Sequence, residues 1–248
     1  MYKEKMTNNP PSNFQLTDAV RPYYDGDTFK SGYRHAEYFD EESKQKIPVI
    51  MISASAEKLM DLFLDLLDPL GKTIDIVLET SHNSEKYDHE DHYREHMDLS
   101  VFKSMCMDYE DLLLNDGFTG IAALNPQTPA EVQFDEHKIL IIYAMDLSPF
   151  EAVLKKHNIP YMPDIRLITE AEHIHRREEE HTLRFQQFLA DTTGATPILP
   201  KPTDLNLDQI FNTSDIDNDP DNKNEPNSDQ NPKWHNDDDD GLDWTPSA

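Results

Sequence analysis

The run Lys138-Ile139-Leu140-Ile141-Ile142-Tyr143-Ala144 is the most apolar stretch of this chain of 248 residues. It is too short to cross a membrane as a helix, which takes roughly 20 apolar residues. Its length and its isoleucine content are typical of a strand that is buried on both faces in the middle of a sheet. A charged turn, Asp135-Glu136-His137, precedes the run, and a helix start at Asp146 follows it.

Strands and helices alternate on both sides of this run. Residues 48–53 form a second apolar strand, an amphipathic helix follows at 56–67, and residues 73–79 alternate like a strand. Strand, helix and strand this close together predict a βαβ unit, which should be parallel and right-handed. Short connections join the strands predicted at 118–124, 131–134 and 138–144, and connections this short require antiparallel neighbours. The remaining predictions are a loop or frayed helix at 81–98, a strand at 164–169, and helices at 99–114, 149–158 and beyond Glu178.

These patterns predict an α/β domain with a single mixed sheet. The sheet would combine a parallel βαβ unit with antiparallel hairpins and carry about four flanking helices, and a two-layer α+β sandwich is the alternative. We assign this domain to residues 47–194. Residues 1–46 would be an N-terminal arm, aromatic-rich from about residue 20, and residues 195–248 a disordered acidic tail, because Pro, Asn and Asp dominate them.

Charge and cysteine content exclude several classes of protein. The net charge is −27, of which −16 falls on residues 47–194 and −10 on residues 195–248. Such a field repels nucleic acid and anionic lipid, so neither is expected as a partner. The single cysteine, Cys106, cannot form an internal disulfide and is expected in the core. No apolar segment resembles a signal peptide or a transmembrane span, so we expect a soluble cytoplasmic protein.

Phosphate-binding and serine-hydrolase motifs are absent from the chain: it contains no Walker A sequence, no G-x-G-x-x-G and no G-x-S-x-G. A possible active site remains at the carboxyl ends of the predicted strands, where open α/β sheets bind ligands. Carboxylates and imidazoles suited to acid–base chemistry lie there. The catalytic candidates are Glu79, His82, Asp146, Glu170 and His173, and Asp146 directly follows the central strand. Polar strand ends also occur in sheets without a site.

Histidine spacing suggests a metal site. His89, His92 and His96 would share one face of a helix, and His173 and His175 would point the same way on an extended chain. Histidine and carboxylate side chains ligate zinc at such spacings. A solvated charged surface is the alternative. An EF-hand at Asp215–Asp219 is excluded, because Pro220 and Pro226 stand where the glycine and the bidentate glutamate are required.

The acidic tail suggests a different class of function. Trp234, Leu242 and Trp244 stand among its carboxylates, and tryptophan is a frequent binding hot spot. Negative charge would steer such a tail toward a basic surface. We therefore expect a non-enzymatic protein-interaction or regulatory protein that needs no cofactor and binds a protein partner with a basic surface. The alternative is a metal-dependent, hydrolase-like enzyme that uses a divalent metal with the His and carboxylate groups at the strand ends.

Overall fold

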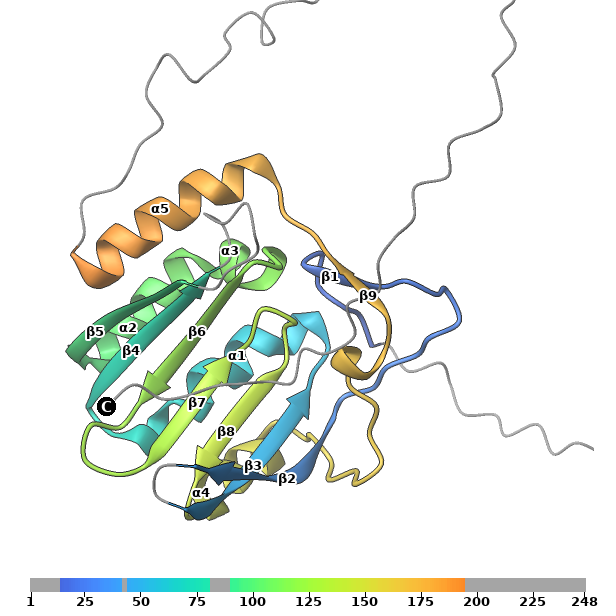
Figure 1. Cartoon of the computed structure of the whole chain (residues 1–248), viewed down its shortest axis with the longest axis horizontal. Coiled ribbons are helices and arrows are strands. Elements are labelled where there is room, and N and C mark those ends of the chain that lie inside the picture. Colours follow the sequence, from blue (N-terminus) through green and yellow to red (C-terminus); the bar gives the residue numbers. More distant parts are fainter. Residues whose placement is uncertain (1–13, 42–43, 81–89, 195–248) are drawn as a thin grey trace, which may run out of the picture. The chain divides into compact units, whose positions relative to one another are not determined.

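A computed structural model describes residues 14–41, 44–80 and 90–194 (Figure 1). These residues belong to one unit of the chain, and a second unit, residues 200–248, lies outside them. The main sheet has seven strands in the order β2-β3-β8-β7-β6-β4-β5, and every neighbouring pair is antiparallel. Its strands are β2 (Gly32–Asp40), β3 (Gln45–Ser53), β4 (Thr73–Thr80), β5 (Glu90–Asp98), β6 (Thr119–Leu124), β7 (Ala130–Phe134) and β8 (Leu140–Ala144).

A two-stranded sheet and the helices complete the described part of the chain. The small sheet pairs β1 (Val20–Pro22) with β9 (His173–His175) in antiparallel fashion. The α-helices are α1 (Ala56–Leu66), α2 (Leu99–Asp108), α3 (Glu110–Asn115), α4 (Ser148–Lys156) and α5 (Glu179–Thr193). Short 3₁₀ turns are η1 (Asp68–Leu70) and η2 (Ile168–Glu170). None of the helices in these ranges is long and apolar enough to span a membrane.

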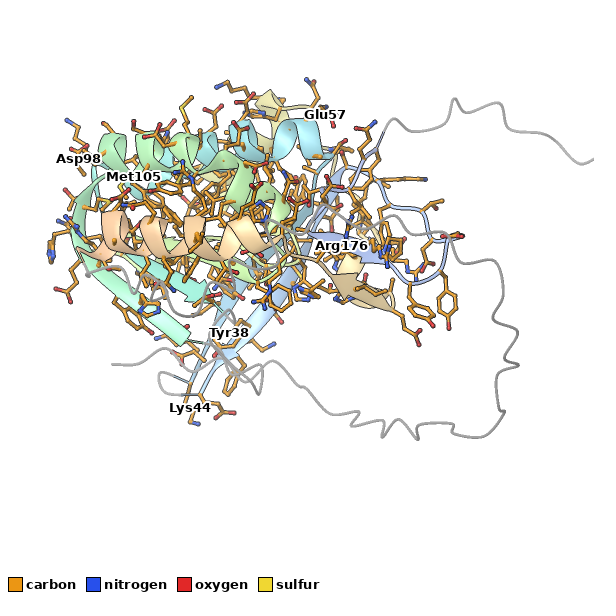
Figure 2. All side chains as sticks on the ribbon, turned by 90° about the horizontal axis from the view of Figure 1, so that it is seen from above. Tyr38, Lys44, Glu57, Asp98, Met105 and Arg176 are labelled. Atoms are coloured by element: carbon orange, nitrogen blue, oxygen red, sulfur yellow. The ribbon has the colours of Figure 1, made fainter. Side chains whose placement is uncertain are left out.

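The helices pack on one face of the main sheet. Alternate side chains of the strands, such as Ile50, Ile142 and Phe134, point into this layer and join one core with buried residues of α1 to α5. Seen from above in Figure 2, Met105 on α2 and Glu57 on α1 lie on the helix side, and Tyr38 on β2 lies on the opposite side. Burial of one sheet face under helices therefore supplies the main core.

The opposite face of the sheet has a second, smaller apolar cluster. Val49 on β3 and Ile141 on β8 contribute to it from the sheet. Ala19, Val20 and Phe29, from the segment that precedes β2, pack onto them together with Ile168 and Ala171. This segment places β1 beside β9 near one end of the sheet (Figure 1).

The predicted α/β character and the antiparallel run of β6, β7 and β8 are confirmed, but the parallel βαβ unit is wrong. α1 does connect β3 to β4, yet β8, β7 and β6 lie between these two strands in the sheet. Four antiparallel pairings separate β3 from β4, so they run in the same direction without touching. An antiparallel sheet with its helices on one face is closer to the two-layer alternative.

Two predictions of local structure are also wrong. Residues 90–98 form the edge strand β5 rather than a loop or helix, and their charges suit an edge that pairs only with β4. Residues 164–167 are irregular and lead into η2. Glu170 explains part of this, because its Oε2 accepts a hydrogen bond from the backbone N–H of Leu167 at 2.9 Å and closes a turn.

A mutation at Phe63 on α1 can test the core between the helices and the main sheet. Phe63 is fully buried, and its ring lies 5.2 Å from that of Phe134 on β7, centroid to centroid. Phe63→Ala should lower the free energy of unfolding by about 3–5 kcal/mol, because it removes buried surface and leaves a cavity. Val101→Ala on α2 is the control, since Val101 is 53% exposed and its loss should change stability by no more than about 0.5 kcal/mol. Equal losses in urea unfolding would contradict this assignment of the core.

Candidate metal centre

The turn between β7 and β8 presents a histidine with a carboxylate behind it. Asp135 Oδ1 accepts a hydrogen bond from the backbone N–H of His137 at 2.6 Å and lies 2.6 Å from His137 Nδ1. Burial opposes ionisation of Asp135, but its bonds to His137 outweigh burial and hold the pKa of this carboxyl below its usual range. An ionised carboxylate only accepts, so Nδ1 of His137 carries a hydrogen. Burial opposes protonation of this ring, but the hydrogen bond and charge of Asp135 raise its pKa, so Nε2 releases a proton when it binds a metal.

Strand β9 supplies two more histidines. His173 and His175 are two residues apart on an extended chain, so both side chains point to the same side. His173 Nδ1 lies 2.7 Å from the carbonyl oxygen of Ala171, and His175 Nδ1 lies 2.5 Å from the carbonyl oxygen of Gly117. Carbonyl oxygens accept and never donate, so in both rings Nδ1 carries a hydrogen, and Nε2 is an acceptor when the ring is neutral.

The three imidazoles converge. His137, His173 and His175 each offer a ring nitrogen, and these atoms all lie within 4.8 Å of one another. The ring centroids are 4.9 Å apart for His137 and His173, and 4.6 Å apart for His137 and His175. The Nε2 atoms of His173 and His175 are only 3.2 Å apart. A ring whose Nε2 is protonated donates a hydrogen bond to the other at this distance, whereas two neutral rings with hydrogens on Nδ1 present two lone pairs that a shared cation would bind.

The distance between the Nε2 atoms of His173 and His175 is close to that expected for two ligands of one metal ion. A tetrahedral zinc ion with Zn–N bonds of about 2.0–2.1 Å places its ligand nitrogens about 3.3–3.4 Å apart. Metal-ligating histidines also donate their other N–H to a carboxylate or a carbonyl, as all three rings do here. Burial and the neighbouring imidazoles lower the pKa of His175 to about 4, so this ring is neutral, as a ligand must be.

The buried side chain of Lys138 holds the β7–β8 turn in place. Lys138, next to His137, has a positive φ of 61°, a backbone conformation that costs a non-glycine residue energy unless its surroundings hold it. Its Nζ donates to the carbonyl oxygen of Thr119 at 2.8 Å, and Thr119 Oγ1 donates to Asp116 Oδ2 at 2.6 Å. Burial lowers the pKa of Lys138 to about 8, while the charge of Asp116 opposes the shift.

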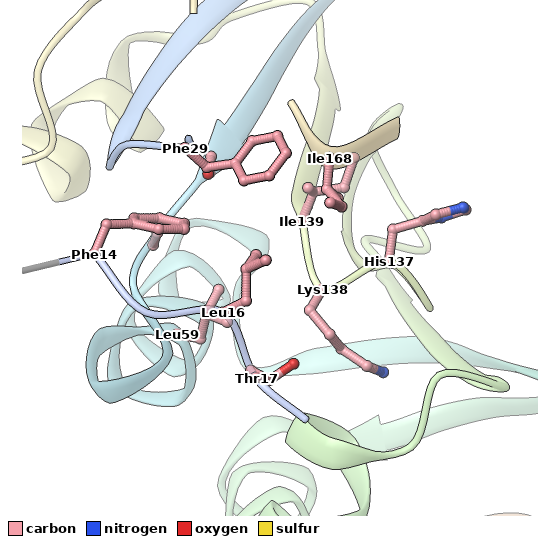
Figure 3. Close-up of a pocket in the computed structure, with 11 residues that line it drawn as sticks. Phe14, Leu16, Thr17, Phe29, Leu59, His137, Lys138, Ile139 and Ile168 are labelled. Atoms are coloured by element: carbon pink, nitrogen blue, oxygen red, sulfur yellow. The ribbon is translucent and has the colours of Figure 1, made fainter. Parts of the chain in front are cut away.

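Beside this turn, the segment that precedes β2 closes a small apolar pocket of about 10 Å³. Figure 3 shows Phe14, Leu16 and Phe29 around it, while the His137 ring points away from them. The neighbouring side chains of His137 and Lys138 therefore have different roles. Lys138 fixes the turn to the start of β6, and His137 is free to meet β9.

Glu79 on β4 lies at the same end of the sheet. It is paired with Gly120 of β6, and Glu79 Oε2 would be 3.2 Å from a Cβ atom added to that glycine. Gly120 thus leaves room for the carboxylate beside the backbone of Glu136 in the β7–β8 turn. Burial, followed by the charges of Asp135 and Asp91, raises the pKa of Glu79 to about 8. Within the described ranges Glu79 has no hydrogen-bond or ion-pair partner.

A second group of potential ligands, Asp111, Glu180 and His181, has a simpler explanation. His181 is buried and its Nε2 lies 3.4 Å from Asp111 Oδ2, at a cleft of about 190 Å³. Both carboxylates are in first turns of helices, α3 and α5, where negative charge is favourable without a cation. Arg176 and Arg177 line the same cleft and oppose a metal ion.

The structure separates most of the site residues that the sequence suggested. His173 and His175 meet each other and His137, which was not a candidate. His92 and His96 lie on β5 and do not join this group, and Asp146 is at the opposite end of β8, where its Oδ1 accepts from Ser148 N at 3.0 Å. Glu170 binds Arg34 at 2.8 Å. His82, His89, Trp234, Leu242 and Trp244 lie outside the described residues.

The signal for His137 was present as Asp135-x-His137, a carboxylate two residues before a histidine in a turn. Comparisons with protein-family models, with curated proteins and with solved structures gave no match to this chain. The functional argument therefore depends on the geometry of the centre alone.

The pKa of Glu79 predicts a pH-dependent stability. Because the folded-state pKa of about 8 exceeds the ordinary 4.5, the contribution of Glu79 is complete below about pH 4.5 and is lost as the pH rises through 8. In EDTA at pH 9, Glu79→Gln should therefore be more stable than the parent protein by roughly 1–3 kcal/mol, and it should show no gain at pH 4.5. Glu95→Gln is the control, because Glu95 is 80% exposed. Parallel pH profiles in urea unfolding would refute the burial of this carboxylate.

Proposed function

We propose that this protein binds a divalent transition metal through Nε2 of His137, His173 and His175. One observation carries the proposal: all three rings place Nδ1 beside an oxygen acceptor, and ring nitrogens of the three residues lie within 4.8 Å of one another, so Nε2 of each ring is left for a metal. Buried ring N–H groups are usually hydrogen-bonded in any case, so it is the convergence of the three ring nitrogens that favours a ligand. The bonds behind the rings fix both the tautomer and the direction of each ligand before any metal arrives.

The donor set favours a particular class of metal. Imidazole nitrogens suit zinc, copper, nickel and iron, whereas magnesium and calcium prefer oxygen ligands. Three histidines around a tetrahedral ion are a familiar zinc arrangement. We therefore take zinc as the reference ion. This function corresponds to the metal-dependent alternative of the sequence analysis. Protein interaction through the acidic tail stays a prediction, because the tail lies outside the described residues.

Zinc binding by the untagged full-length protein tests the proposal. Titration calorimetry and elemental analysis after gel filtration should show one tightly bound zinc per chain, and His173→Ala should weaken binding by at least about 100-fold. His96→Ala is the matched control, since this histidine of β5 is 70% exposed and outside the cluster. Excess magnesium should not displace the zinc. Zinc that is absent, or that is lost equally in both variants, would refute the centre.

Asp135 should tune the affinity without being a ligand. Asp135→Asn keeps an oxygen that can accept from the backbone N–H of His137, but it removes the charge behind His137 Nδ1. We expect zinc affinity to fall by about 10-fold to 100-fold, as is usual for such supporting groups, with one zinc still bound at saturation. A competition assay with a zinc chelator measures the change. Unchanged affinity would mean that His137 does not ligate through Nε2.

A further inference from the structure

The part of the chain that the structure describes offers three protein ligands to the proposed metal centre. Within the described residues the group consists of His137, His173 and His175, and Asp135 is engaged behind His137 rather than pointing at the centre. Structural zinc sites use four protein ligands, whereas catalytic sites use three and leave a position for water. All three imidazoles are partly exposed, and 22% of the His137 side chain is accessible, so solvent reaches the cluster.

The carboxylate of Glu79, which has no cationic partner among the described residues, lies near the same turn. Glu79 lies over Gly120, whose nearest backbone neighbours are Glu136 and Phe134, the residues on either side of Asp135. Asp135 is also the largest charge acting on Glu79. The carboxylate of Glu79 and the ligand His137 therefore flank one short turn. The absence of a counter-ion within the described residues distinguishes Glu79 from Glu170, which is held by Arg34.

We infer that the centre is hydrolytic: the bound metal activates a water molecule for attack on the acyl carbon of an ester, and Glu79 accepts the proton that this water releases. The inference depends on the proposed metal site. A divalent ion in a site of three imidazoles keeps its full double charge, because the ligands are neutral, and this charge lowers the pKa of bound water toward neutrality. An ester is the simplest acyl substrate for such a nucleophile.

The reaction balances without any further reagent. Water on the fourth metal position loses one proton, which passes through solvent to the Glu79 carboxylate. The water oxygen forms a bond to the carbonyl carbon, the bond from that carbon to the leaving oxygen breaks, and the departing alkoxide takes the proton back from Glu79. One ester and one water become one acid and one alcohol, and both the metal and Glu79 return to their first state.

The electrostatics suit this role. Burial among like charges raises the pKa of Glu79 to about 8 in the metal-free protein, and a dication nearby lowers it toward the working pH, where a general base is most effective. Glu131 on β7 is a natural comparison, because burial also raises its pKa, to about 7. Its Oε1, however, accepts from Gln133 at 2.7 Å, so this carboxylate is occupied. Glu131 is also farther from the β7–β8 turn along strand β7 than Gln133 is.

The decisive experiment measures hydrolysis of 4-nitrophenyl acetate by the full-length protein loaded with one zinc. We expect a rate at least about 100-fold above that of equimolar free zinc, and a loss of this rate in His173→Ala, which lacks the metal. Glu79→Gln should keep its zinc but lower kcat by roughly 10-fold to 100-fold. It should also lose the pH dependence that Glu79 confers. Glu131→Gln should stay within about twofold of the parent rate.

The outcomes separate the two proposals. Stoichiometric zinc without hydrolysis above the free-ion rate would overturn the hydrolytic inference and leave the metal site intact, as a tie between β9 and the β7–β8 turn. Failure to bind zinc would overturn the metal site itself. Hydrolysis that Glu79→Gln leaves unchanged in rate and pH profile would remove Glu79 from the reaction. Circular dichroism and zinc content of each variant show that a lost rate reflects the substitution and not unfolding.

Discussion

The backbone of Gly117 joins the two sheets of this protein. Its N–H donates to the carbonyl oxygen of Arg176 at 2.8 Å, and its own carbonyl oxygen accepts from His175 Nδ1 at 2.5 Å. A Cβ atom at this position would lie 2.4 Å from the carbonyl oxygen of Ala19, so only glycine lets the strands approach. The contacts of Gly117 therefore hold β1 and β9 beside the main sheet and also orient the His175 ring toward the other histidines. A larger residue at 117 would disturb both together.

Like charges shape the surroundings of the centre. Glu79, Asp135 and Glu136 gather at one end of the sheet in a chain of net charge −27. The pKa values of Asp135 and Glu79 move in opposite directions, because His137 stabilises the charge of Asp135, while burial and like charges raise the pKa of Glu79, which has no cation among the described residues. Imidazoles within such a field form a site that a dication would enter favourably. The acidity that excludes nucleic acid as a partner is thus compatible with metal binding.

Sequence patterns could predict part of the centre and could not predict its assembly. His173 and His175 are two residues apart, and any extended chain places such a pair on one side. Their third partner is 36 residues away in sequence, as the difference between 173 and 137 shows. No local sequence pattern connects His137 to His173 and His175. The helix-like spacing of His92 and His96 was misleading, because residues 90–98 form the edge strand β5, and their many charged side chains suit such an edge. His89 lies outside the described residues.

The sequence by itself determined the elements: the buried strand around Ile139–Ile142, the amphipathic α1, and the antiparallel run of β6, β7 and β8 with its short connections. These follow from burial periodicity and loop length, which act between near neighbours. Only the tertiary structure decided the strand order, which separates β3 from β4, and the meeting of His137 with β9. Both result from contacts between distant segments, such as Ala19, Gly117 and Arg176, and no local periodicity encodes which of these segments will touch.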